Sequence, residues 1–119
     1  MTRSGIIFEA GALVLLPFPF SDATTTKRRP VLALTTPDEY GDFIGMAVSS
    51  RSHHINAVPL QSDALLEGHL PKPSWIRVDR VVTLNVGSVI KAFAITKMDV
   101  HRQAVSSLCE MLQKQITKA

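Results

Sequence analysis

The chain has 119 residues, of which 45% are hydrophobic, and it carries a formal net charge of +3 at pH 7. This composition excludes an intrinsically disordered chain, suits one domain over residues 1–119, and is compatible with a polyanionic partner such as nucleic acid. Cys109 is the only cysteine, so no intramolecular disulfide can form. With neither an apolar leader nor a membrane span in the sequence, we expect a cytoplasmic protein.

Short apolar or alternating runs separated by Gly and Pro dominate the first eighty per cent or so of the chain and are typical of β-strands. They predict strands over Ala12–Leu16, Val31–Thr36, Phe43–Val48, Ala57–Leu60, Ser74–Leu84 and Val89–Ile95. In the longest run, side chains alternate between two faces: Trp75, Arg77 and Asp79 share one side, and Ile76, Val78 and Arg80 share the other.

The period changes after residue 95. Thr96-Lys97-Met98-Asp99 matches a capping box, with Thr96 as the N-cap of a helix. Apolar residues then recur at three-and-four spacing, at Val100, Ala104, Val105, Leu108, Met111, Leu112 and Ile116. Cys109 lies on this stripe and is expected to be buried. The sequence therefore predicts a mainly β fold, a small bent antiparallel sheet or partly open barrel, closed by a C-terminal helix.

Two polar clusters flank the predicted strands and are the candidates for chemistry. The first is the basic triplet Lys27-Arg28-Arg29, and the second is the run SSRSHH, from Ser49 to His54. A guanidinium binds phosphate through two parallel hydrogen bonds, and a neighbouring hydroxyl can donate another. The alternative is that both clusters are hydrated turns.

Metal and cofactor chemistry finds no support in the sequence. The four histidines, His53, His54, His69 and His101, do not pair with Cys or carboxylates at ligand spacing. No Gly-rich phosphate loop or dinucleotide fingerprint is present. We therefore expect neither a metal nor another cofactor.

Three segments together resemble the PemK/MazF toxin family. They are GALVLLPFPFSD at Gly11–Asp22, KRRPVLAL at Lys27–Leu34 and SWIRVDRVVTL at Ser74–Leu84. The resemblance implies an SH3-like small barrel of the MazF/CcdB type. It further implies the toxin of a type II toxin–antitoxin pair, a metal-independent, sequence-selective endoribonuclease that cleaves single-stranded RNA and inhibits growth. The partners implied are a second copy of the chain and an antitoxin with an acidic disordered tail, with operator DNA bound only through the antitoxin.

The resemblance also assigns roles to residues. The family's phosphate-binding arginine falls on Arg29 and its catalytic hydroxyl on Ser49. RNA contacts are expected from Lys27, Arg28, Phe18, Phe20, Ser50, Arg51 and Arg80. His53 and His54 titrate in the range of a general acid or base. Phe18 and Phe20 are alternatively core residues, and Trp75 belongs either to the core or to a dimer interface.

Two other functions remain open at this point. One is a gyrase-poisoning toxin of the same fold, which binds a protein and catalyses nothing. Its recognition depends on a Trp-Gly-Ile-like tail, whereas this sequence ends in QKQITKA. The other is a silent relative that binds only its antitoxin and operator DNA. The presence of both Arg29 and Ser49 favours the enzyme.

Overall fold

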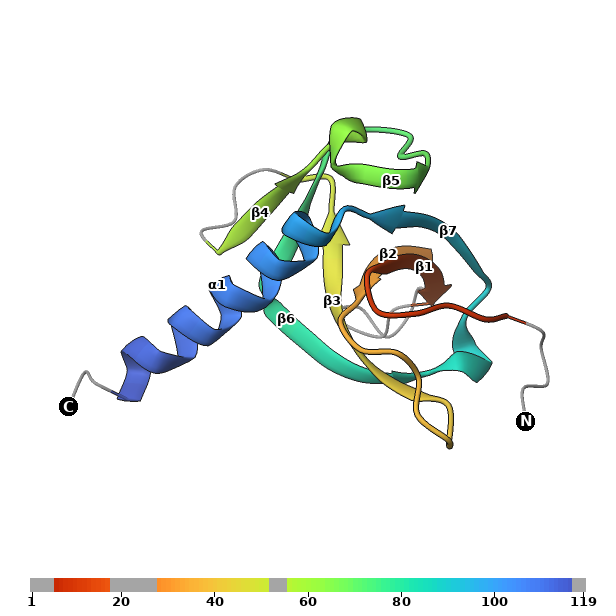
Figure 1. Ribbon diagram of the computed structural model, residues 1–119, viewed down its shortest axis with the longest axis horizontal. Helices are drawn as coiled ribbons and strands as arrows, with labels where there is room; N and C mark the ends of the chain where they lie inside the picture. The colour runs from red at the N-terminus through yellow and green to blue at the C-terminus, as the bar shows by residue number, and fades with distance from the viewer. Residues whose placement is uncertain (1–5, 18–27, 52–55, 117–119) are drawn as a thin grey trace.

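The computed structural model describes residues 6–17, 28–51 and 56–116. Seven strands form one antiparallel sheet in the order β4-β6-β3-β2-β1-β7-β5, and the sheet curls on itself into a partly open barrel (Figure 1). The strands are β1 (Ala12–Pro17), β2 (Arg28–Ala33), β3 (Asp42–Ser49), β4 (Ala57–Leu60), β5 (Leu65–Gly68), β6 (Ser74–Asn85) and β7 (Lys91–Thr96). Short 3₁₀ turns cover Ser62–Ala64 and Val86–Ser88, and the helix α1 spans Met98–Ile116. The predicted mainly β fold with a C-terminal helix is confirmed.

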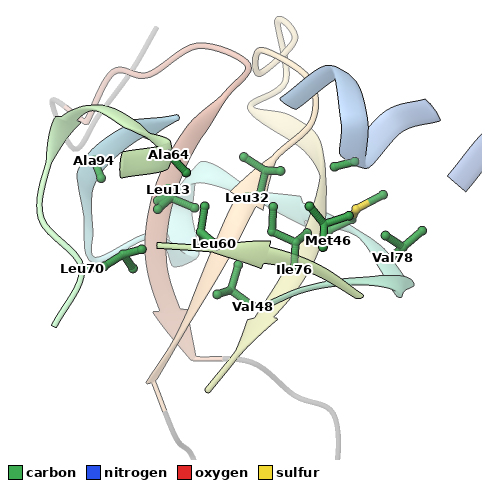
Figure 2. Close-up of a cluster of buried hydrophobic side chains, with 12 residues drawn as sticks. Leu13, Leu32, Met46, Val48, Leu60, Ala64, Leu70, Ile76, Val78 and Ala94 are labelled. Atoms are coloured by element: carbon green, nitrogen blue, oxygen red, sulfur yellow. The ribbon is translucent and has the colours of Figure 1, made fainter. Parts of the chain in front are cut away.

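The central strands bury side chains on both of their faces. One cluster fills the inside of the curl, where Figure 2 shows Leu13, Leu32 and Met46 converging with residues of β4 and β6. The alternate residues Val14 and Val31 belong to a second cluster on the opposite face. Burial on both sides explains why the first strands read as unbroken apolar runs rather than alternating ones.

The second strand starts earlier than the sequence predicts. We expected it over Val31–Thr36, but β2 begins at Arg28 and ends at Ala33. Its first residues extend the ladder with β1, where Arg29 pairs with Leu16. The recorded ladder with β3 ends at Val31, so Pro30, which has no N–H, lies where β2 has a bonded neighbour on one side only. Two arginines expected in a loop therefore belong to the sheet.

Strand β5 has no counterpart in the sequence prediction. Its four residues, LLEG, are too few to show a period, and most of them are exposed. The strand exists because it pairs with β7 at the edge of the sheet. Gly68 ends β5 with a φ of +92°, and a Cβ at this position would overlap the backbone of Phe93 and Ala94. Long-range pairing, which a local pattern does not reveal, creates this element.

The predicted N-cap at Thr96 is wrong. Thr96 is the last residue of β7, is 4% exposed, and precedes a helix that begins at Met98. Its hydroxyl donates a 2.7 Å hydrogen bond to the carbonyl oxygen of Gly11, which also accepts the Thr96 N–H at 2.9 Å. The side chain therefore fastens β7 to the turn before β1 and is not available to cap the helix.

The helix packs on the sheet mainly through its first half. Ala104 is fully buried, and Val100 and Leu108 lie against the cluster inside the curl. Farther along, Leu112 and Ile116 are exposed, and so is Cys109, which corrects the prediction that this thiol is buried. The reason is visible in Figure 1, where the last turns of α1 extend beyond the sheet. Within the described residues, no helix has the length and apolar character needed to cross a membrane.

Candidate functional site

The candidate site lies at one end of the sheet, where several strands begin or end. In an antiparallel sheet the last residues of one strand lie beside the first residues of the next. The end of β1 at Pro17 is therefore next to the start of β2 at Arg28. The end of β3 at Ser49 is likewise next to the start of β6, where it pairs with Trp75. Arg28 and Arg29 thus lie at the same end of the sheet as Ser49.

Arg29 and Ser49 occupy corresponding positions just beyond the recorded ladder of β2 and β3. The recorded register pairs Val31 with Ala47, and the same register extended by two residues puts Arg29 across from Ser49. Side chains two residues apart on a strand share a face. Both residues consequently fall on the face of the second cluster, to which Val31 and Ala47 belong. Both are partly exposed, so a ligand at this end of the sheet can reach them.

The two arginines of β2 differ in their surroundings. Arg28 is exposed and pairs with Pro17, whereas Arg29 is partly buried and pairs with the fully buried Leu16. As neighbours on a strand they point to opposite faces. Among the described residues, none forms a hydrogen bond or an ion pair with the Arg29 guanidinium, and its donors are therefore available to an anionic ligand.

The hydroxyl group of Ser49 is oriented by the turn that follows β3. Its Oγ accepts a hydrogen bond of 3.1 Å from the backbone N–H of Arg51. With one lone pair engaged in this way, the hydroxyl proton remains free to be donated to a ligand oxygen. Ser50 and Arg51 are both exposed at the same turn.

Strand β6 contributes further side chains to this end of the sheet. Trp75 pairs with Ser49 on one side and with Pro59 of β4 on the other. Two residues farther on, Arg77 forms a bidentate ion pair with Asp79, with Nε–Oδ1 at 3.2 Å and Nη2–Oδ2 at 3.0 Å. Asp79 therefore holds the guanidinium of Arg77 on this face of β6.

Arg80 lies in an irregular stretch of β6. The ladder with β3 pairs Ile76 with Val48, and then resumes at Val81 and Met46. The intervening residues of β6 outnumber those of β3, which makes this stretch a bulge, a feature that often occurs beside binding sites. Arg80 is exposed there.

Other predicted site residues lie outside the described ranges. These are Lys27, Phe18, Phe20, His53 and His54. Their predicted roles in RNA binding and proton transfer remain predictions. Within the described ranges, no group of three or more His, Cys, Asp or Glu side chains is arranged to hold a metal ion.

Arg77 did not enter the set of site residues predicted from the sequence. The signal that identifies it is the alternation of β6: Trp75 and Arg77 are partly exposed, while Ile76 and Val78 are buried. The sequence shows this alternation, but not that β3 presents Ser49 to the same face. The juxtaposition depends on strand register, which a single strand does not contain.

Two hollows of the described surface lie elsewhere. One has a volume of about 520 Å³ and is lined by the segment around Phe8 and by Phe93 and its neighbours on β7. The other, of about 360 Å³, separates Met111 on α1 from Val58 on β4. Neither is lined by Arg29 or Ser49, so neither of these two hollows is the candidate site.

The sequence matches a known protein family over residues 9–116, the family described as PemK-like, MazF-like toxin of type II toxin–antitoxin system. This match includes nearly the whole chain and every strand of the sheet. Among curated protein sequences there is no significant match.

Solved structures with the same fold include toxins and toxin–antitoxin complexes. MazF in the Form-III MazE–MazF crystal structure from Deinococcus radiodurans has a TM-score of 0.73 and 22% identity, with 90% of this chain and 97% of that chain covered. MazF alone from the same organism gives a TM-score of 0.68, 24% identity and coverages of 90% and 97%. A mycobacterial endoribonuclease gives 0.68, 10% identity and coverages of 93% and 96%. At these identities the similarity establishes the fold.

Proposed function

Because the chain belongs to the PemK-like, MazF-like toxins of type II toxin–antitoxin systems, we propose that it is a metal-independent endoribonuclease that cleaves single-stranded RNA at short sequence motifs. The observation that supports the proposal is the register of β2 and β3. Extended by two residues, it aligns the partly buried Arg29, which has no partner among the described residues, with the hydroxyl group of Ser49. The name of one structural neighbour, a mycobacterial endoribonuclease, supports the same activity. Cleavage of messenger RNA in the cytoplasm would stop translation and growth.

The reaction uses a nucleophile that RNA itself supplies. The ribose 2′-oxygen attacks the adjacent phosphorus, a 2′-O–P bond forms, and the P–O5′ bond breaks. The products are a 2′,3′-cyclic phosphate and a free 5′-hydroxyl. The 2′-hydroxyl loses a proton and the leaving 5′-oxygen gains one, so the enzyme must position the phosphate, stabilise the negative oxygens and assist both transfers.

Arg29 and Ser49 suit the two electrostatic tasks. The guanidinium of Arg29 donates hydrogen bonds to the nonbridging phosphate oxygens and stabilises the charge that develops in the transition state. The Ser49 hydroxyl, which accepts from Arg51, donates its own proton to one of these oxygens. His53 and His54 are the candidates for proton transfer. Lys27, Arg28, Arg51 and Arg80 contribute positive charge to the RNA path.

The biological assembly that we propose is a homodimer inhibited by an antitoxin. Structural neighbours include MazE–MazF complexes, which supports an antitoxin as partner. An acidic tail that lies across Arg28 and Arg29 would occupy the RNA site, and its binding would weaken as salt screens the charges. Operator DNA would be bound only through the antitoxin.

The test is cleavage of a short single-stranded RNA by the purified protein in the presence of EDTA. Arg29→Ala should lower the cleavage rate by about 10² to 10³, the cost of removing one transition-state donor. Arg29→Lys should recover little, because the guanidinium fork is lost. Ser49→Ala should reduce the rate while leaving RNA affinity unchanged.

Arg28→Ala is the matched control, since it removes the same charge from the adjacent residue on the other face of β2. It should weaken RNA binding without a comparable loss of rate. If Arg28→Ala and Arg29→Ala are equally harmless in folded protein, the basic triplet is a hydrated part of the surface and the nuclease proposal is wrong. If the purified wild-type protein leaves the RNA intact, the result would favour a noncatalytic toxin of this fold.

A further inference from the structure

We propose that Trp75 is a stacking platform for an RNA base next to the cleaved phosphate, and that Arg77, held by Asp79, binds a neighbouring phosphate. The proposal rests on the proposed RNA cleavage and extends it by a base subsite on β6. The two side chains lie on one face of β6, at the end of the sheet where Ser49 is located.

The position of Trp75 is the first observation. It is paired directly with Ser49 on β3, and directly opposed residues on antiparallel strands have Cβ atoms roughly 4.5–5.5 Å apart. A base one nucleotide away from a phosphate bound at Ser49 is therefore within reach of the indole ring. On its other side Trp75 is paired with the exposed Pro59 of β4, which continues the apolar surface for the base.

The surroundings of Trp75 differ from those of a core residue. Its strand neighbours Ser74 and Ile76 are buried, whereas Trp75 itself is partly exposed. Among the described residues none accepts a hydrogen bond from the indole N–H, although buried tryptophans usually satisfy this donor. Proteins that bind single-stranded RNA stack its bases on partly exposed aromatic rings of this kind.

The ion pair of Arg77 supplies the second observation. Asp79 binds Nε and Nη2 of the guanidinium, which leaves the other terminal nitrogen with its donors. The Arg77 side chain is only 18% exposed, so its orientation is fixed and little entropy is lost when a phosphate binds. Residues two apart on a strand are on the same side, and Arg77 is therefore next to the base that Trp75 would hold.

The experiment uses the intrinsic fluorescence of the protein, because Trp75 is the only tryptophan of the chain. A short single-stranded RNA added to the Ser49→Ala protein, which should bind RNA without cleaving it, is expected to quench the emission to saturation. The same RNA with an abasic site beside the cleavage position should bind with less quenching. RNA that binds without any change in emission would overturn the proposal.

Steady-state kinetics of the variants separate effects on RNA binding from effects on the cleavage step. Stacking acts on bound substrate and transition state alike, so Trp75→Ala should raise KM by roughly 5- to 150-fold and leave kcat nearly unchanged, while Trp75→Phe should keep most of the affinity. Arg77→Ala should flatten the salt dependence of binding by about one phosphate contact. Tyr40→Ala is the control, because Tyr40 is 76% exposed and precedes the opposite end of β3.

The outcomes distinguish this inference from the proposed nuclease. If the wild type cleaves RNA while folded Trp75→Phe and Trp75→Ala proteins keep its KM, the base subsite is refuted and the proposed nuclease activity is not contradicted. Quenching by RNA without cleavage would support the subsite and refute the nuclease. If the tryptophan emission changes with protein concentration but not on addition of RNA, the proposal is wrong and Trp75 belongs to a dimer interface.

Discussion

The bond between Thr96 and Gly11 leads to a stability prediction that also separates two roles for Thr96. Thr96→Val replaces the hydroxyl with a methyl group of similar size. The Gly11 oxygen keeps the bond from the Thr96 N–H at 2.9 Å, so no buried acceptor is left without a donor. The cost is then one buried hydrogen bond, about 0.5–1.5 kcal/mol. For a domain of this length, thermal unfolding should shift down by roughly 2–6 °C.

Two further substitutions at the same residue distinguish the strand contact from a helix cap. Ser and Asp are both good N-caps, so a capping role predicts that Thr96→Ser and Thr96→Asp are tolerated. The strand contact predicts that only Thr96→Ser is tolerated. Thr96→Asp would put a carboxylate, which only accepts hydrogen bonds, against the Gly11 carbonyl oxygen at a site that is 4% exposed.

The assay is thermal unfolding followed by circular dichroism, with Thr83→Val as the matched control because Thr83 is an exposed strand threonine. The control should change the midpoint very little. A Thr96→Asp protein as stable as the wild type would refute the strand-contact reasoning, and so would equal destabilisation by Thr96→Val and Thr83→Val.

Three other predictions concern different parts of the chain. The Asn85 side chain forms hydrogen bonds with the backbone of Tyr40 and Gly87 and with the side chain of Asp42. Asn85→Ala should therefore lower the free energy of unfolding, measured by chemical denaturation, by about 1–3 kcal/mol. An unchanged free energy of unfolding would contradict a structural role. A Cβ on Gly45 would overlap Val31, so Gly45→Ala should destabilise the fold by about 1–3 kcal/mol; unchanged chemical denaturation would contradict this tight contact. A peptide of the antitoxin's acidic tail should inhibit RNA cleavage less as salt rises, and full-rate cleavage in the toxin–antitoxin complex would refute occlusion.

The sequence predicts the fold well where the pattern is local. Continuous apolar runs identified β1 and β3, and the alternation of Trp75 to Arg80 identified β6 as a strand with two distinct faces. The three-and-four spacing identified α1. Each of these signals is contained in the segment that forms the element.

The errors arise where a distant partner decides the outcome. Thr96 satisfies the local pattern of a cap, but its hydroxyl donates a hydrogen bond to the carbonyl oxygen of Gly11, which is far away in sequence. LLEG has no strand pattern and becomes β5 through pairing with β7. Cys109 and Leu112 follow the apolar stripe, yet α1 extends past the sheet that would cover them.

The candidate site could likewise be predicted only in part from the sequence. Residue type and family resemblance identify Arg29 and Ser49 individually, because guanidinium and hydroxyl groups are typical of phosphate chemistry. Their alignment, and the presence of Trp75 and Arg77 beside them, depend on the registers of β2, β3 and β6. Register is set by packing across the sheet, which a linear pattern does not display.

The pairing of β1 with β7 has a consequence for how the protein is made. Ala12 lies beside Ile95, so one side of β1 has no partner until nearly all the described chain has left the ribosome, on the order of seconds at ordinary rates of translation. Strands β2 and β3, with Arg29 and Ser49, emerge much earlier. Closure of the sheet is a late, long-range event of the kind that slows folding. A nascent chain that ends before Lys91 would carry both residues on an unfinished sheet with an open edge at β1.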